Sequence, residues 1–219
     1  SAIIGKLNKK KTDYENFENI DCDCICVSGN WTPTVHLSSQ SGNKLKFDEK
    51  VNAFIPNQSK QNESTIGSAN GSFTLKNSLK EGFDKGFELS KKITGKDSKI
   101  SSPTSNERSY GQQDKFWCMP LPKNKNYKRC VDFQNDVYVS DIELAIREVF
   151  RSIEHVKRYT TLGMATDQGR TSNLNGLQLV LNIEKKIIPE VGHTTFRPPY
   201  TPVTIGAIVG REVGKHYRP

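Results

Sequence analysis

The sequence predicts a mixed α/β and α+β protein, with short strands in the first half and short helices in the second. Runs of β-branched residues that end in glycine and proline turns predict the strands. Apolar residues spaced three and four apart predict three short helices between Asp141 and Ile183. The stretch 94–113 is rich in Lys, Ser, Gly and Asn without apolar period, which is typical of a linker. We therefore expect a first domain at 1–93, a linker at 94–113, a helical domain at 114–193 and a proline-rich tail at 194–219.

Composition and charge exclude some classes of protein. The 219 residues suffice for one large domain or two small ones. No apolar run approaches the roughly 20 residues that span a bilayer, and no signal peptide is recognisable. The net charge of +8 is scattered rather than gathered on a basic arm with interleaved aromatics, so nucleic-acid binding is only a minor alternative. Because the chain begins at Ser1, we expect a fragment, a processed chain or a trimmed one.

The five cysteines favour reduced thiols over a metal site. Cys22, Cys24 and Cys26 alternate, so a strand would point all three to one face. That pattern is more typical of an apolar face than of structural zinc, which favours C-x-x-C pairs. We therefore expect free thiols and a cytoplasmic location.

Two strands and one helix are expected in the first half. A strand over Ile20–Ser28 ends in the turn Gly29–Pro33, and such turns at the carboxyl edge of a parallel sheet are where α/β proteins bind nucleotides. A second strand is expected over Val51–Ile55. The small residues Gly67–Gly71 open a helix with apolar residues every four positions from Leu75 to Phe87. N–H groups at such a helix start can meet a pyrophosphate, with a plain tight turn as the alternative.

Three further helices and a strand are expected between residues 131 and 183. An alternating run predicts a strand over Val131–Val139, and Ser140 with Glu143 has the capping-box spacing for the helix that follows. Ser152 is the expected N-cap of the next helix, with Gly163 as its stop.

A polar loop leads into the last of these helices. We expect the Asp167 carboxylate to accept from backbone N–H groups at the start of the helix Asn173–Ile183. After the extended tail, Thr201 and Pro202 read as the N-cap and first position of a final helix through Val213.

Four blocks of the sequence resemble one known family along nearly the whole chain. In order they are CDCICVSGNWTPTVHLSSQSGNKLKFD, STIGSANGSFTLKNSLKEGF, VKRYTTLGMATDQGRTSNLNG and TTFRPPYTPVTIGA. They are similar to the α subunit of heterotetrameric sarcosine oxidase. The resemblance implies a piece of a much larger subunit. Residues 1–93 would be the C-terminal part of a disulfide-oxidoreductase-like FAD/NAD-binding domain, 114–193 a small helical domain, and 194–219 would include the start of a folate-binding aminomethyltransferase-like domain.

The resemblance also implies a function and its cofactors. The family oxidises the N-methyl group of sarcosine through a flavin, reduces oxygen to hydrogen peroxide, and passes the one-carbon unit to tetrahydrofolate. It implies NAD in the α subunit, FMN at the interface with the β subunit, and γ and δ subunits as further partners. The amine pocket would lie in the β subunit. The first glycine-rich βαβ unit is missing from this sequence, so the isolated chain is expected to bind NAD poorly and to be inactive.

The resemblance assigns roles to two groups of residues. Those expected to face the dinucleotide are Gly29, Asn30, Trp31, Thr32, Pro33, Gly67, Ser68, Ala69, Asn70 and Thr74. Lys157, Arg158 and Arg170 can meet a flavin phosphate or an acidic partner, because guanidinium pairs with phosphate in a bidentate way. Ordinary salt bridging within the helical domain is the alternative for these three, and no catalytic residue is assigned.

The helical part also resembles a BFD-type ferredoxin module that holds a 2Fe–2S cluster with four cysteines. The likeness puts Asp132 and Gln134 at the first pair of ligand positions, and Asp167 and Ser172 at the second. None is cysteine, and such clusters require thiolates. We therefore predict a cluster-free module. The alternative function, a small electron-transfer or interaction module of another amine oxidoreductase, is disfavoured by the same absence.

Overall fold

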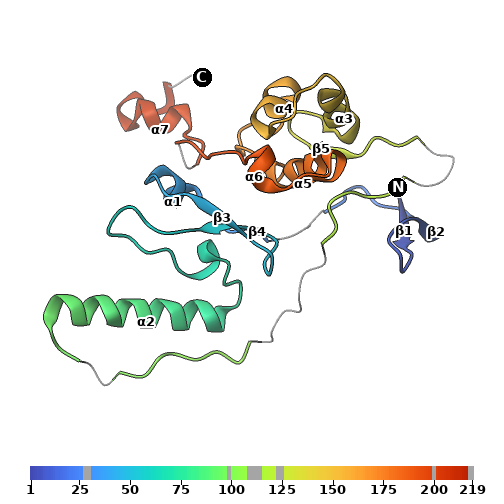
Figure 1. The fold of residues 1–219 in the computed structure, drawn as a ribbon. Helices are drawn as coiled ribbons and strands as arrows, with labels where there is room; N and C mark the ends of the chain where they lie inside the picture. The colour runs from blue at the N-terminus through green and yellow to red at the C-terminus, as the bar shows by residue number, and fades with distance from the viewer. Residues whose placement is uncertain (27–30, 98–99, 108–114, 122–125, 199–200, 217–219) are drawn as a thin grey trace. The chain divides into compact units, whose positions relative to one another are not determined.

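The computed structural model describes residues 1–26, 31–97, 100–107, 115–121, 126–198 and 201–216. It contains two compact units (Figure 1). The first comprises Ser1–Gly29 with Phe116–Thr194, and the second comprises Asn30–Lys115 with Thr195–Pro219. Each unit is therefore built from two separate stretches of sequence.

The first unit begins with a hairpin, β1 (Ala2–Leu7) and β2 (Tyr14–Ile20), whose register shifts between Ile4 and Lys6. The prediction of a strand over Ile20–Ser28 is wrong for residues 21–26, because β2 ends at Ile20 and these residues are not in a strand. Ile20 pairs with Ala2. Residues 27 and 28 lie outside the described residues.

A second hairpin, β5 (Cys130–Asp132) and β6 (Val137–Tyr138), replaces the single strand expected over Val131–Val139. The Asp132 carboxylate folds the turn between them, because it accepts from the N–H groups of Gln134 (3.0 Å) and Asn135 (3.4 Å). Every sheet among the described residues is a two-stranded antiparallel pair. The mixed α+β prediction is thus confirmed, while the expected parallel sheet does not occur in that part of the chain.

Four helices complete the first unit: α3 (Val139–Arg147), α4 (Ile153–Thr160), α5 (Asn173–Glu184) and the short α6 (Ile188–Val191). The first three confirm the prediction of three helices between Asp141 and Ile183. α3 packs on both α4 and α5, as Figure 1 shows. The core between them holds side chains that are almost fully buried: Ile142, Ala145, Ile153, Val156, Leu162, Leu177 and Val180.

The helix ends confirm one predicted cap and correct two. The Ser152 hydroxyl accepts from the His155 N–H (3.3 Å) at the start of α4, as expected. At α3, the carboxylate that accepts from the Tyr138 N–H (2.8 Å) belongs to Asp141, so the predicted Ser140–Glu143 box is wrong by two residues. α4 ends before Thr161, which itself adopts the left-handed conformation (φ 64°), rather than at Gly163.

The second unit contains α1 (His36–Gln40), the antiparallel pair β3 (Leu45–Asp48) and β4 (Ala53–Pro56), and a 3₁₀ turn, η1 (Gly67–Asn70). β4 confirms the strand predicted over Val51–Ile55, displaced by a turn at residues 51 and 52. The unit ends with α7 (Ile205–Val209) and η2 (Arg211–His216). Thr204, rather than Thr201, caps α7 by accepting from the Ala207 N–H (3.3 Å).

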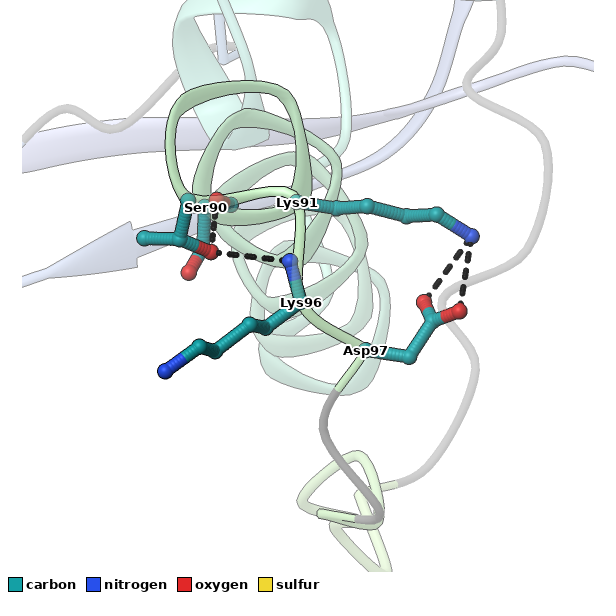
Figure 2. A network of polar contacts seen from close by, with 5 residues as sticks. Ser90, Lys91, Lys96 and Asp97 are labelled. Atoms are coloured by element: carbon teal, nitrogen blue, oxygen red, sulfur yellow. Dashed lines mark hydrogen bonds and ion pairs between the residues drawn. The ribbon is translucent and has the colours of Figure 1, made fainter.

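The predicted helix after Gly67–Gly71 is α2 (Leu75–Thr94), which carries no buried residue. Thr74 caps its start, and Gly95 ends it at φ 69°. Figure 2 shows this end, where Lys91 pairs with Asp97 (2.9 Å). The Thr94 hydroxyl donates to the Ser90 carbonyl (2.8 Å) and accepts from the Lys96 N–H (3.2 Å). Residues 100–107 form no helix or strand, and no helix in the described ranges is long and apolar enough to cross a membrane.

Candidate functional site

The polar loop between α4 and α5 folds against the β5–β6 turn in the first unit. Asp132, only 1% exposed, joins the two segments: one carboxylate oxygen accepts from the Gly163 N–H (2.7 Å) and from the Ser172 hydroxyl (3.2 Å). The other oxygen accepts from the two N–H groups of its own turn. The Asn135 side chain adds a further tie by donating to the Thr161 carbonyl (3.0 Å). A single buried carboxylate therefore organises this site.

Gln134 makes a second connection beside the first. Its side-chain carbonyl accepts from the Thr166 hydroxyl (3.0 Å) and from the Asp167 N–H (3.5 Å). The structure thus brings together, in pairs, the four positions that the sequence aligns with cluster ligands: Asp132 with Ser172, and Gln134 with Asp167.

The donor set at these positions does not fit an iron–sulfur cluster. The side chains are carboxylates, an amide and a hydroxyl, whereas such clusters need thiolates. Cys130 lies two residues before Asp132 on β5, and desolvation by burial, followed by the charges of Asp136 and Asp132, raises the pKa of its thiol. Within the described ranges, no group of three or more His, Cys, Asp or Glu side chains could hold a metal ion.

Asp167 holds the loop from inside, as predicted. Its carboxylate accepts from the N–H groups of Gly169 (3.0 Å) and Thr171 (3.3 Å) and from the Thr171 hydroxyl (2.7 Å). Burial alone raises the pKa of this carboxyl, but the hydrogen bonds from Thr171 and Gly169 and the charge of Arg170 outweigh burial and lower it. These N–H groups lie in the turn that leads into α5.

Asn173 closes the loop, a role that the sequence reasoning missed. Its amide, in a residue only 7% exposed, lies against Gly163 and Gly169, and a Cβ at either glycine would overlap it. Both glycines also have positive φ, 65° and 73°. The signal in the sequence was two glycines flanking the loop, one of which was read only as a helix stop.

The three cationic candidates lie on and beside this loop. Lys157 and Arg158 are in the last turn of α4, where Arg158 lies 4.0 Å from Glu154. The Arg170 guanidinium donates to the Asp167 carbonyl (3.1 Å). Arg158 and Arg170 therefore make contacts within the helical domain, in line with the alternative of ordinary salt bridging there.

The second unit brings the two predicted dinucleotide segments together. The ring of Trp31 lies 6.5 Å from that of Phe73, next to Thr74. Trp31 is 71% exposed and Thr32 is exposed, while Pro33 is buried. Gly29 and Asn30 lie outside the described residues.

Backbone N–H groups of the 67–75 segment donate hydrogen bonds to carboxylates of the same chain. The Gly67 N–H donates to Glu81 (2.8 Å), which also accepts from the Ser72 hydroxyl. The Leu75 N–H at the first position of α2 donates to Glu107. Ser68, Ala69 and Asn70 complete η1 between these donors. A phosphate that binds here has to replace Glu81 or Glu107.

Comparison with known proteins gives a family match in the second half of the chain. Residues 126–211 match the model of the sarcosine oxidase A3 domain. This region contains the β5–β6 hairpin, the loop and helices α3 to α7.

Proteins similar to most of the chain carry one name. Sarcosine oxidase subunit alpha of Rhizobium meliloti is 35% identical over 92% of this chain, and that of Corynebacterium sp. (strain P-1) is 34% identical over 98%. The same subunit of Corynebacterium sp. (strain U-96) is 31% identical over 98%. The chain covers 20% to 23% of these relatives, so it spans about a fifth of their length.

A solved structure shares the fold. The crystal structure of L-proline dehydrogenase from P. horikoshii matches 81% of this chain and 37% of its own, with a TM-score of 0.57 and 22% identity.

Proposed function

Since the chain is related to the alpha subunits of sarcosine oxidase and contains a sarcosine oxidase A3 domain at residues 126–211, we propose that it works as part of such an alpha subunit. The similarity along 92% to 98% of the chain carries this proposal. It is an oxidoreductase subunit by relationship.

The proposed reaction is the oxidative demethylation of sarcosine. Sarcosine, oxygen and water give glycine, formaldehyde and hydrogen peroxide, with the one-carbon unit passed to tetrahydrofolate when that acceptor is bound. A flavin supplies the two-electron chemistry. We assign none of this chain's side chains to the reacting atoms. The proposed role of the chain is to bind cofactors and to assemble with β, γ and δ subunits in a cytoplasmic complex.

We propose that the second unit contributes to a dinucleotide site for NAD. The pairing of Trp31 with Phe73 supports this, because it sets the turn 31–33 beside the loop that ends at Thr74. Carboxylates on the Gly67 and Leu75 N–H groups count against tight binding by the chain alone. The domain order 1–93, 114–193 and 194–219, joined by a linker at 94–113, belongs to the same proposal.

We propose that the first unit shapes the interface near FMN. The loop is tied down through Asp132, Gln134 and Asp167, and the half-buried Arg170 is held against it by donating to the Asp167 carbonyl. Lys157 and Arg158 at the end of α4 add positive charge on the same unit.

Co-purification tests the assignment. A tagged copy of the chain, expressed in its native host, should bring down flavin and the polypeptides of an oxidase complex. Iron analysis of the same sample separates the electron-transfer alternative, since stoichiometric iron and sulfide would support that alternative and contradict this proposal.

Charge removal tests the interface. Replacing Arg158 and Arg170 together by alanine in the assembled complex should lower FMN content and subunit association, because two guanidinium contacts to phosphate or carboxylate are lost. Arg147→Ala, another exposed arginine in the same unit, is the matched control. Unchanged flavin content and association in the double variant would refute the interface role.

A further inference from the structure

The first unit contains a groove that plays no part in the proposed function. Its volume is about 680 Å³, and it is lined by the β1–β2 hairpin, the segment 116–121, residues 127–131 with Phe133, and parts of α3 and α5. Small-molecule sites in proteins have volumes of roughly 300–1,000 Å³. All lining residues belong to the same unit.

Six of the nineteen described residues that line this groove are aromatic, and most of the others are aliphatic or contain sulfur. Rings come from the hairpin, from the segment 116–121 and from the β5 region: Tyr14, Phe17, Phe116, Trp117, Tyr127 and Phe133. Phe133 is 72% exposed and Phe17 is 55% exposed, so their faces are accessible. Aromatic faces stack on flat ring systems more favourably than on branched aliphatic ones.

The charge of the lining has one sign. Arg129 and Lys128 line the groove, the Lys128 ammonium lies 4.7 Å from the centre of the Tyr138 ring, and no Asp or Glu is among the described residues of the lining. The Arg129 guanidinium is held in place by donating to the Cys118 sulfur (3.1 Å) and the Met119 carbonyl (3.2 Å). Its nearest carboxylate, Glu143 at 3.5 Å, is not part of the lining. The fixed charge inside the groove is therefore positive and suits an anion.

Two titratable groups in the lining are perturbed. Desolvation by burial, and then the Cys118 charge, raise the pKa of Tyr14, against the opposing effect of Arg129. The pKa of Cys130 is also raised, chiefly by burial. Perturbed groups that converge on a concave, apolar surface are a physical mark of binding sites.

We propose that this groove binds a planar aromatic molecule that carries an anionic group. The rings lie against the aromatic side chains of the lining, and the anion lies against Arg129 with Lys128 beside it. The proposal stands on the groove alone, so it does not depend on the role of the chain in an oxidase.

A pair of probes that differ in charge tests this with the full chain. 8-Anilinonaphthalene-1-sulfonate is an anion with a planar naphthalene ring, and N-phenyl-1-naphthylamine is its neutral counterpart. Arg129→Gln should weaken binding of the sulfonate about tenfold, the loss of one charge-assisted hydrogen bond. It should change binding of the neutral probe less than about twofold. Arg147→Gln, which removes the same charge from an exposed residue outside the lining, is the control.

Two further measurements keep the test decisive. Lys128→Gln, at an exposed residue, should weaken sulfonate binding in the same direction if Arg129→Gln does not fold. The sulfonate should also slow alkylation of Cys118, which lines the groove, and leave that of the exposed Cys24 unchanged. Equal binding of both probes in all variants, or no protection of Cys118, would overturn the proposal and favour a protein-contact surface.

Discussion

Asp132 shows how one residue can hold together distant parts of a small unit. Its carboxylate accepts four hydrogen bonds, two from its own turn and two from residues 31 and 40 positions further along. Burying a charge is costly unless the charge is fully hydrogen-bonded. The four donors meet that condition, so loss of the carboxylate leaves several buried polar groups without a partner.

Asp132→Asn should therefore lower the free energy of unfolding by about 3 kcal/mol, because the new amide turns a donor towards a backbone N–H. Urea unfolding followed by circular dichroism measures the change. Asp136→Asn is the control, since Asp136 is exposed at φ 51°, a conformation that asparagine tolerates. Equal stability of the two variants would contradict the central role of Asp132.

Asp167 predicts a defined pH dependence. The folded state lowers the pKa of this carboxyl, so the native protein binds fewer protons there than the unfolded chain. The resulting stabilisation is present above the unfolded pKa, about 3.9, and is lost as the pH falls through the folded pKa.

Asp167→Asn should accordingly be less stable than the parent at pH 7, and the gap should shrink below about pH 4. Melting temperatures of both proteins at pH 7, 5 and 3 measure it. The Ser41 hydroxyl lowers the pKa of Glu63, and the Lys186 side chain lowers the pKa of Glu184. The parent and the Asp167→Asn variant therefore both lose stability in acid. Only the difference between them reports on Asp167, and a constant difference would contradict the prediction.

At the scale of elements, the loop between α4 and α5 is a packed structure rather than a solvated turn. The Asn173 amide fills the space over Gly163 and Gly169, and Gly176 in α5 leaves room for Leu162. Thr161, Gly163, Gln168 and Gly169 all have positive φ. The backbone conformation and the packing therefore require the same glycines.

Gly169→Ala should cost about 3 kcal/mol, because a methyl group overlaps Asn173 in addition to straining the left-handed backbone. Gly95→Ala separates the two effects: its φ of 69° is similar but its Cβ meets no atom within 4 Å, so it should cost about 1 kcal/mol. Chemical denaturation of each variant gives these values. Equal losses at both glycines would show that the contact with Asn173 does not matter.

The sequence predicted the elements better than their ends. Helix period was sufficient for α2, α3 and α4, because each keeps apolar residues on one side. It also predicted α5 from Leu174, Leu177 and Leu181, although Leu179 on another side of that helix is buried too. It could not show that Val131–Val139 is a hairpin, since an Asp-centred turn interrupts an alternating run that is otherwise strand-like. The sequence also predicted a strand over Ile20–Ser28, whereas residues 21–26 are not in a strand.

For the candidate site, too, the sequence predicted some features and missed others. The alignment with cluster ligands named the four positions, but it did not specify that Asp132 contacts Ser172 and Gln134 contacts Asp167. The role of Asn173, and the carboxylates on the Gly67 and Leu75 N–H groups, depend on contacts between residues 4 to 32 positions apart. Local pattern has no access to such contacts.

For the whole molecule, the main property is that two units are each assembled from separate stretches of the chain. The first has a core of fully buried apolar side chains between α3, α4 and α5, whereas the longest helix of the second, α2, buries no residue. Apolar burial provides most of the stability of a folded unit. The two units should therefore differ in stability.

Each unit contains one tryptophan, Trp117 in the first and Trp31 in the second, which allows them to be followed separately. We expect Trp31→Phe, which reports through Trp117, to unfold at a higher urea concentration than Trp117→Phe, which reports through Trp31. Fluorescence titrations with urea measure both midpoints. A single common midpoint would show that the two units unfold as one.

The carboxylate of Asp132 has a consequence for how the protein is made. A loop centred on an inorganic cluster must wait for iron, sulfide and an assembly system before it takes its final shape. Here the group at the centre of the loop is a side chain, present as soon as the ribosome has passed residue 132, and its last partner, Ser172, follows only 40 residues later. The loop therefore has the side chains that tie it to the β5–β6 turn once residue 172 has joined the chain.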